Sequence, residues 1–433
     1  MRWPRALFIV VLALAPSVAG AQGLAGLFGG LFGRTPERVG KDFTTLEFRS
    51  AAGGQYDDAI LDDSTPAELK VRSGATAGAN SGLAFERRSD RLRVAAHGNG
   101  THQQFFREPA FGATSYDTGA ILLAKVATRL SIDASTTYRR LPFFHLLPAS
   151  SGAVPMPAVL VPGHAYAARK LDNDTLDSMV GFSSPYTRRS TLSASVTRRT
   201  TRFFNEPDNN FGVWGARGMW TRKLNRDLAA RIGYGREEIR QTAFGDTRFV
   251  HEVFDVGLDL AREIALDRRT ALTFNTQTSI IRETGGDRRY RLNGGLSVIR
   301  AFQRTWATSV SANRTTEFLP GFLQPIFADS VSGTVSGMLA PRVEWSGTLG
   351  ASRGQVGFKN LGKFITYSGT SRLSAGVTRY LGIFADYSYY HYALPAGTTS
   401  IALLPQLSRQ AVSVGLSAYV PIFTRMRTPR DPR

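Results

Sequence analysis

Six histidines are the residues of this chain best suited to bind a metal ion or to transfer a proton. The closest pair, His97 and His102, lies in the run HGNGTH, inside an expected strand. Side chains alternate between the two faces of a strand, so the odd spacing puts the two rings on opposite faces, about 17 Å apart. One metal ion cannot be shared across that distance.

Other chemical motifs are also missing. The sequence has no H-E-x-x-H helix motif and no phosphate-binding P-loop. It has no cysteine, which excludes disulfides, thiolate metal sites and a cysteine nucleophile. We therefore expect no enzyme activity, no metal ion and no cofactor.

Arginine is the charged residue that stands out. The chain has 53 basic residues, of which only seven are Lys, against 34 acidic ones, and its formal net charge is +19. The arginines are scattered singly or in short pairs, which argues against a basic tail or a single binding patch. Because no basic-aromatic motif accompanies them, we expect no nucleic-acid partner.

Several charged residues lie on the polar faces of expected strands. A guanidinium group that lines a water-filled interior would attract carboxylate, phosphate or sulfate. Acidic residues on the same faces could pair with the arginines and cancel their field, and the whole set could equally serve only to solvate a wet wall. The candidate lumen-lining residues are Arg93, Arg199, Arg231, Arg291, Arg372, Asp255, Asp259, Glu344 and Asp386.

The elements that must position these residues alternate with a period of two. In 343–351, 191–199, 254–260 and 410–423 one face is apolar and the other is small and polar. This pattern predicts strands with one buried and one wet face. After the N-terminal segment no run of about 18 apolar residues occurs, so membrane-spanning helices are not expected.

The connections between the expected strands are asymmetric. Short polar turns at 88–90, 225–227, 266–268 and 303–305 alternate with longer segments at 55–66, 105–115, 141–174, 317–326 and 393–406, while 284–287 is a short exception. Short turns at one end and long loops at the other are typical of an outer-membrane β-barrel. A closed barrel also satisfies the backbone hydrogen bonds of strands in lipid.

We predict an all-β protein, a transmembrane antiparallel up-and-down barrel of about 18 strands, with 16 as the next most favoured number. Aromatic residues near the strand ends would anchor it at both membrane interfaces, although a soluble all-β fold could also use them in its core. The expected strands are 43–51, 68–87, 91–104, 115–127, 129–139, 175–187, 190–203, 210–222, 227–240, 250–263, 270–283, 288–300, 305–316, 327–340, 343–352, 364–379, 381–392 and 408–423.

The N-terminus indicates export. Arg2 and Arg5 precede an apolar stretch, 6–18, and a small-residue cleavage site at 19–21. This is the three-part form of a signal peptide, with a buried N-terminal helix as the alternative. We divide the chain into a signal peptide (1–21), a Gly-rich periplasmic leader (22–42), the barrel (43–423) and a basic C-terminal tail (424–433).

With these features the chain resembles the porin-like outer-membrane proteins of Gram-negative bacteria. The resemblance is architectural, covers about residues 43–423, and includes a last strand that ends in an aromatic residue, Phe423. It implies a location in the cell outer membrane, contact with lipid and lipopolysaccharide, insertion by the barrel-assembly machinery, and the option of a homo-oligomer.

In porins of this architecture the third loop folds into the barrel and narrows the pore. The segment 141–174 is the third long loop here, and its prolines reduce its conformational freedom. The alternative is a loop packed over the outer mouth. The candidate constriction residues are Phe143, Phe144, His145, His164, Arg169 and Lys170.

The sequence therefore predicts a channel through which hydrophilic solutes diffuse, with a preference for anions, because an 18-stranded barrel is too wide for side chains to fill. The alternatives are an export conduit for an anionic exopolysaccharide, and a barrel that transports nothing and serves a structural or adhesive role at the surface.

Overall fold

A computed structural model describes most of the chain, in segments separated by gaps. The described residues are 42–61, 71–106, 112–145, 167–225, 228–242, 247–260, 264–265, 269–283, 288–302, 305–322, 324–357, 362–395 and 405–426. The expected signal peptide and most of the leader lie outside them.

The described residues form long strands and one short 3-10 helix, η6 (Pro207–Asn209). None of the helical segments described is long and apolar enough to cross a bilayer. The strands are β1 (Phe43–Leu61), β2 (Val71–Arg88), β3 (Leu92–Phe105), β4 (Ala113–Ala127), β5 (Leu130–His145), β6 (Ala167–Ser184), β7 (Ser190–Phe203), β8 (Phe211–Lys223), β9 (Leu228–Gln241), β10 (Thr247–Leu260), β11 (Ile264–Ala265), β12 (Thr270–Glu283), β13 (Arg288–Phe302), β14 (Trp306–Glu317), β15 (Ile326–Ala340), β16 (Val343–Val356), β17 (Gly362–Gly376), β18 (Leu381–Ala393) and β19 (Gln406–Met426).

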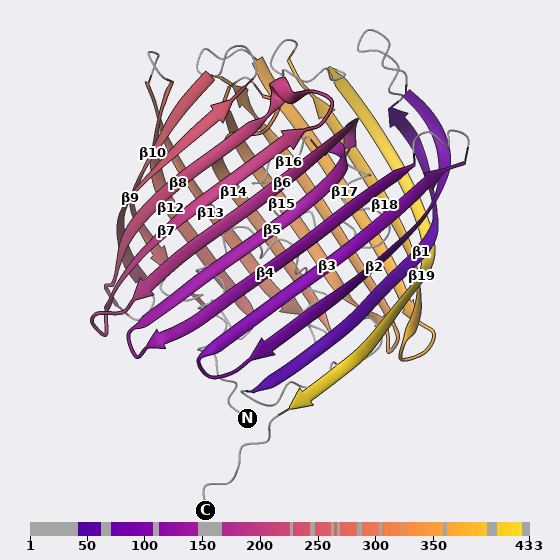
Figure 1. Cartoon of the computed structure of the whole chain (residues 1–433), viewed down its shortest axis with the longest axis horizontal. Helices are drawn as coiled ribbons and strands as arrows, with labels where there is room; N and C mark the ends of the chain where they lie inside the picture. The colour runs from indigo at the N-terminus through magenta and orange to yellow at the C-terminus, as the bar shows by residue number, and fades with distance from the viewer. Residues whose placement is uncertain are drawn as a thin grey trace, which may run out of the picture.

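The strands close into a single barrel (Figure 1). Each strand pairs antiparallel with its neighbours in sequence, and β1 pairs with both β2 and β19, so the sheet has no free edge at the junction of first and last strands. The two-residue β11 follows β10 and pairs with the same strand, β12. The wall is therefore a ring of 18 strands, and the predicted barrel is confirmed.

Several strands run further than predicted, most of all β1, β5 and β6. β1 continues to Leu61, β5 continues to His145 and β6 already begins at Ala167, so the hairpins β1–β2 and β5–β6 reach into segments that were expected to be loops. β19 continues past Phe423 to Met426, which pairs with Phe43. These ends were missed because polar residues and Pro142 break the alternation there, whereas pairing with a neighbouring strand keeps the backbone extended.

The two faces of the wall differ as the alternation predicts. Leu192, Val196, Val256, Leu349 and Leu416 are among the large apolar side chains that remain exposed on the outer face. The inner face carries mainly Ser, Thr, Asn, Gln and charged side chains, many of them buried. At the end with the short turns, outward aromatic residues pair: Trp306 lies 6.0 Å from Trp345, and Trp220 donates a hydrogen bond to Tyr186 (2.5 Å).

Candidate functional site: the inner face of the barrel

The predicted lumen arginines lie on the inner face, where a carboxylate accompanies each of them. On β3, Arg93 contacts Glu86 at 3.0 Å. On β7, Arg199 contacts Asp177 of the neighbouring β6 at 2.5 Å. Because the partners stand on adjacent strands, cross-strand register sets each pair.

A three-residue charge cluster stands on β8, β9 and β10. Asp255 is fully buried and forms ion pairs with Arg231, at 2.6 Å, and with Arg217. Arg231 also donates to the carbonyl of Thr276 (2.7 Å), and Arg217 to the amide oxygen of Gln277 (3.3 Å). Gly233 makes room for the carboxylate, since a Cβ there would lie 3.1 Å from Asp255 Cβ. Arg217 was not predicted, although it lies on the same face of its strand as the other lumen candidates.

The remaining predicted residues are spread over other parts of the wall. Arg372 lies 3.6 Å from Asp386 on β18, and Glu344 faces the same side from β16. Arg291 on β13 contacts Asp329 at 3.1 Å. Asp259 lies in β10 opposite Ala229, and its side chain lies outside what the structure describes.

The structure adds inner-face pairs that the sequence pattern did not single out. His97 contacts Asp117 at 3.1 Å, and Arg139 reaches the same carboxylate at 3.4 Å. His251 hydrogen-bonds Glu237 at 2.9 Å. The partners stand on adjacent strands of the wall, so only knowledge of the strand register could have found them.

In most of these pairs the basic side chain is more exposed than its carboxylate, whereas Asp329 and Glu237 are more exposed than Arg291 and His251. The side chain of Arg199 is 41% exposed and that of Asp177 is 31%. For Arg139 and Asp117 the fractions are 44% and 28%, and for Arg217 and Asp255 they are 39% and 0%. At these three pairs the positive side chain is therefore more accessible than the negative one.

The tip of the β14–β15 hairpin folds inward at the long-loop end. Pairing between β13 and β14 begins only at Gly294 and Arg314, although β13 itself begins at Arg288. Above that point the inner-face Arg289 packs over the ring of Phe327, with 4.3 Å between guanidinium carbon and ring centroid, and donates to the carbonyl of Gly357 (3.3 Å). Val331 and Val335 lie on the same face of β15 as Phe327, nearer the short turns, and there this face is exposed on the outside of the barrel. The tip therefore lies on the lumen side of β13.

The inward tip connects apolar side chains from opposite walls. Phe318 and Phe327 join a buried cluster with Phe211, Ile239, Phe249 and Ile281, from β8, β9, β10 and β12. Phe322 belongs to a second cluster, to which Leu171 of β6 and Val356 of β16 also belong, although these strands stand on opposite sides of the ring. Wall side chains alone cannot fill a barrel of 18 strands. The tip residues supply the apolar contacts that narrow the lumen at this end.

The predicted constriction segment behaves differently from the prediction over its described part. Phe143, Phe144 and His145 lie in β5, paired with Lys170, Arg169 and Ala167 of β6, so these residues form the end of a hairpin rather than a loop. His164 and the rest of 146–166 lie outside the described residues. The residues that fold inward in the structure are 318–322 and 324–325, in a stretch that the sequence marked only as a long connection.

A sharp turn shapes this inward tip. Leu319, Pro320, Gly321 and Phe322 form a turn in which the amide of Phe322 donates to the carbonyl of Leu319 (3.3 Å). Gly321 has a φ of 77°, which residues with a Cβ rarely adopt, and Pro320 fixes the preceding position. Pro-Gly at these places is the sequence signal that could have predicted the turn.

One run of residues in the wall has the sequence of a catalytic motif but not its geometry. Residues 350–354 read G-A-S-R-G, the spelling of a serine nucleophile elbow, but they run through the middle of β16, where Ser352 is buried, and not through a strand-to-helix turn. Among the described residues no group of three or more His, Asp or Glu side chains is placed to hold a metal ion.

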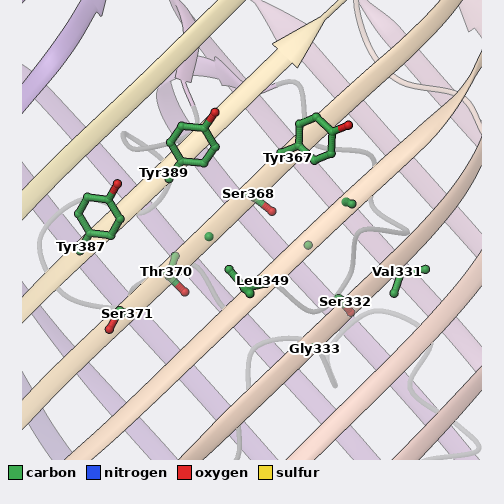
Figure 2. Close-up of a pocket in the computed structure, with 13 residues that line it drawn as sticks. Val331, Ser332, Gly333, Leu349, Tyr367, Ser368, Thr370, Ser371, Tyr387 and Tyr389 are labelled. Carbon is green, nitrogen blue, oxygen red and sulfur yellow. The ribbon is translucent and has the colours of Figure 1, made fainter.

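A hollow of about 780 Å³ lies on the outer face of β15–β18 rather than in the lumen (Figure 2). Its floor includes Gly333 and Gly369, and Leu349, Tyr367 and Tyr387 rise around it. These large side chains belong to the exposed outer face. The hollow therefore takes no part in a path through the barrel.

Comparison with known proteins shows likeness in structure only. No family model matches the chain, and no curated protein matches it. The chain is similar to Pseudomonas aeruginosa OccK7 (OpdD), with 9% identity, coverage of 88% of this chain and 99% of that one, and a TM-score of 0.45. It is also similar to P. aeruginosa OccK11 (OpdR), with 12% identity, coverage of 89% of this chain and 99% of that one, and a TM-score of 0.43. A third similar structure is the P. aeruginosa siderophore receptor PirA, with 9% identity, coverage of 87% of this chain and 80% of that one, and a TM-score of 0.40.

Proposed function

We propose that this protein is an outer-membrane channel through which small hydrophilic solutes diffuse, with a moderate preference for anions. The observation that carries the proposal is the contrast between the two faces of one closed wall. The outer face is apolar and the inner face carries ion pairs and hydroxyl groups. Polar lining of a wide antiparallel barrel is the arrangement of a water-filled pore.

The membrane placement rests on the same contrast together with the sequence. An apolar outer band with aromatic residues at the short-turn end suits a bilayer, and the expected signal peptide would deliver the chain for insertion by the barrel-assembly machinery. The long-loop end then faces the cell exterior, and the short turns face the periplasm.

The difference in exposure within the ion pairs supports the preference for anions. Arg139, Arg199 and Arg217 are more exposed than their carboxylate partners, so their guanidinium groups are more accessible to an ion in the lumen. Pairing weakens the field without reversing it. The same charge arrangement would serve an anionic polysaccharide, but the inward tip leaves such a polymer less room than a small solute.

Single-channel conductance in a planar bilayer tests the proposal. We would compare the wild type with a variant in which residues 318–325 are replaced by Asn-Gly. A two-residue turn fits there because Glu317 and Ile326 are already paired. We expect steady steps from the wild type and larger steps from the variant. The control is Phe106→Ser, an exposed residue at the same end, which should conduct like the wild type.

A barrel without transport activity is the second candidate, and the apolar clusters at the long-loop end favour it. If a folded, heat-modifiable barrel conducted in neither form, the channel proposal would be wrong. A structural or adhesive role for the outer loops would then take its place.

A further inference from the structure

Folding gathers arginines that are scattered in the sequence into one basic patch on the outer face. The patch consists of Arg140 on β5, Arg198 and Arg202 on β7, Arg236 and Arg240 on β9, and Arg248 on β10. All six are exposed and lie in the halves of their strands nearer the long-loop end. The sequence-based expectation that basic charge forms no patch is therefore wrong for this side of the barrel.

Strand register brings these arginines close together. Arg140 and Arg202 lie opposite the same residue of β6, Asp174. Arg240 lies opposite Arg248 on one side and Gly212 on the other. Gly212 leaves a gap between β7 and β9, because a Cβ built there would have no atom within 4 Å. The gap is open to a group that approaches from the outside.

The positive charge of the patch is only partly neutralised. Glu238 binds both Arg240 and Arg248, Asp174 lies between Arg140 and Arg202, and Glu252 lies opposite Arg236. Arg198, Arg202 and Arg236 form no ion pair or hydrogen bond within the described part of the chain. The six arginines nevertheless outnumber these carboxylates, and an excess of positive charge on a face that otherwise meets lipid favours an anionic ligand, because a guanidinium group facing hydrocarbon is unfavourable.

The patch borders an apolar surface on the side of the short turns. Trp214 lies opposite both Arg198 and Glu238, and Tyr234 packs against Phe254 at 5.2 Å between ring centroids. Below these rings Val196, Ile232 and Val256 are exposed. A ligand that fits this surface has anionic groups at one end and long apolar chains at the other.

Basic residues on the outer face are most numerous on β5–β10; within the described residues the outer faces of β14, β16 and β17 carry only Arg314, Arg353 and Lys363. The outer faces of β1, β3 and β4 carry no Arg or Lys within the described residues, and β2 carries only Arg87, at the short-turn end. A general attraction to the membrane surface would need no such asymmetry. The concentration of charge on β5–β10 indicates a defined site.

We propose that the basic patch binds the phosphate groups of a phosphorylated outer-leaflet glycolipid, lipopolysaccharide, whose acyl chains lie along the apolar surface below Trp214. Arginine suits this role because its planar fork binds phosphate oxygens in pairs. The inference rests on the outer-membrane placement proposed above but does not require the barrel to conduct.

Native mass spectrometry of the purified barrel in neutral detergent tests the site. Bisphosphorylated lipid A and its dephosphorylated form would be titrated against the wild type and the triple variant Arg198→Ser, Arg202→Ser, Arg240→Ser. The matched control is Arg353→Ser with Lys363→Ser, two exposed basic residues on the outer faces of β16 and β17. Near a membrane surface each basic residue contributes about 1 kcal/mol, a factor of about five, so the triple variant should bind at least tenfold more weakly. The control should bind like the wild type.

Three results would overturn the inference. The dephosphorylated lipid could bind the wild type equally well, the triple variant could bind as tightly as the control, or inorganic phosphate could displace the lipid completely, which would indicate a simple anion site. Binding is measured without conduction, so a barrel that binds lipid A but passes no current would leave this inference standing and overturn only the channel proposal.

Discussion

At the scale of single residues, one ion pair closes the junction between the first and last strands. Asp57 of β1 is fully buried, and Arg409 of β19, only 2% exposed, binds both of its carboxylate oxygens. Pairing between these strands ends at Asp57 and Ala411, so the guanidinium group lies at the end of the ladder nearest the long loops. The amide of Gln410 also donates to Asp58 there (2.6 Å). These contacts hold the ends of the sheet together where the backbone ladder stops.

We predict that Arg409→Met destabilises the barrel strongly. The substitution leaves Asp57 buried without its partner, and breaking a buried pair in this way costs about 3–5 kcal/mol. The double variant Asp57→Leu, Arg409→Met should recover most of that loss, because no buried charge remains. Equilibrium unfolding in guanidinium, followed by heat-modifiable electrophoretic mobility, measures both changes.

The control for this pair is Arg49→Met, on β1, the strand that also carries Asp57. Arg49 contacts Glu47 at 3.0 Å, but its side chain is 66% exposed, so its loss should cost less than about 1 kcal/mol. If Arg409→Met unfolded at the same guanidinium concentration as Arg49→Met, the closing role of the ion pair would be wrong.

At the scale of elements, most strands were predictable because the alternation of apolar and polar residues in each strand marks its two faces. The strands at 190–203 and 270–283 match their predicted bounds, and the first strand, predicted at 43–51, runs on to Leu61. The inward tip was not predictable in this way. Phe327 alternates with outward-facing residues, and only the contact with Arg289 on another strand shows that its face is covered.

We predict that the inward tip can detach without unfolding the barrel. Phe327→Ala removes a ring that packs with Arg289 and the apolar cluster around Phe249. A fixed core position would lose about 3–5 kcal/mol on this change. If the tip opens locally, the free energy of unfolding of the whole barrel can fall by no more than the free energy of opening the tip. The barrel should therefore lose less than a fixed core position would, while the tip becomes more exposed.

Cysteine labelling measures that exposure without background, because the chain has no cysteine. Leu319→Cys, in the tip, should react slowly with a bulky maleimide in the otherwise wild-type protein and at least tenfold faster together with Phe327→Ala. Phe106→Cys, at an exposed position, should react quickly in both backgrounds. Equal, slow labelling of Leu319→Cys in both would show that the tip is a fixed part of the wall.

At the scale of the whole molecule, charge is sorted by face. Most inner-face arginines contact a carboxylate, whereas three arginines of the outer basic patch form no ion pair within the described part of the chain. The formal charge of +19 therefore says little about the lumen. The sequence allowed the inner residues to be chosen by their face, but their partners depend on which strands are neighbours. The sign of the electrostatic field in the lumen also depends on how exposed each charged side chain is, and the sequence alone does not give that exposure.

The difference in exposure between Arg199 and Asp177 leads to two predictions about ion selectivity that have opposite signs. At about 4 Å in water a unit charge changes the energy of an ion by about 1 kcal/mol, so neutralising one exposed lumen charge should change ion selectivity severalfold at most. Arg199→Gln should lower the chloride-to-potassium permeability ratio, because it removes the more exposed partner of the pair. Asp177→Asn should raise the same ratio, because it releases Arg199 from its carboxylate. Reversal potentials under a salt gradient measure both variants at unchanged pore size. If the two substitutions moved the reversal potential in the same direction, the lumen charges near β6 and β7 would not set the selectivity, and a preference for anions would have to come from another part of the path.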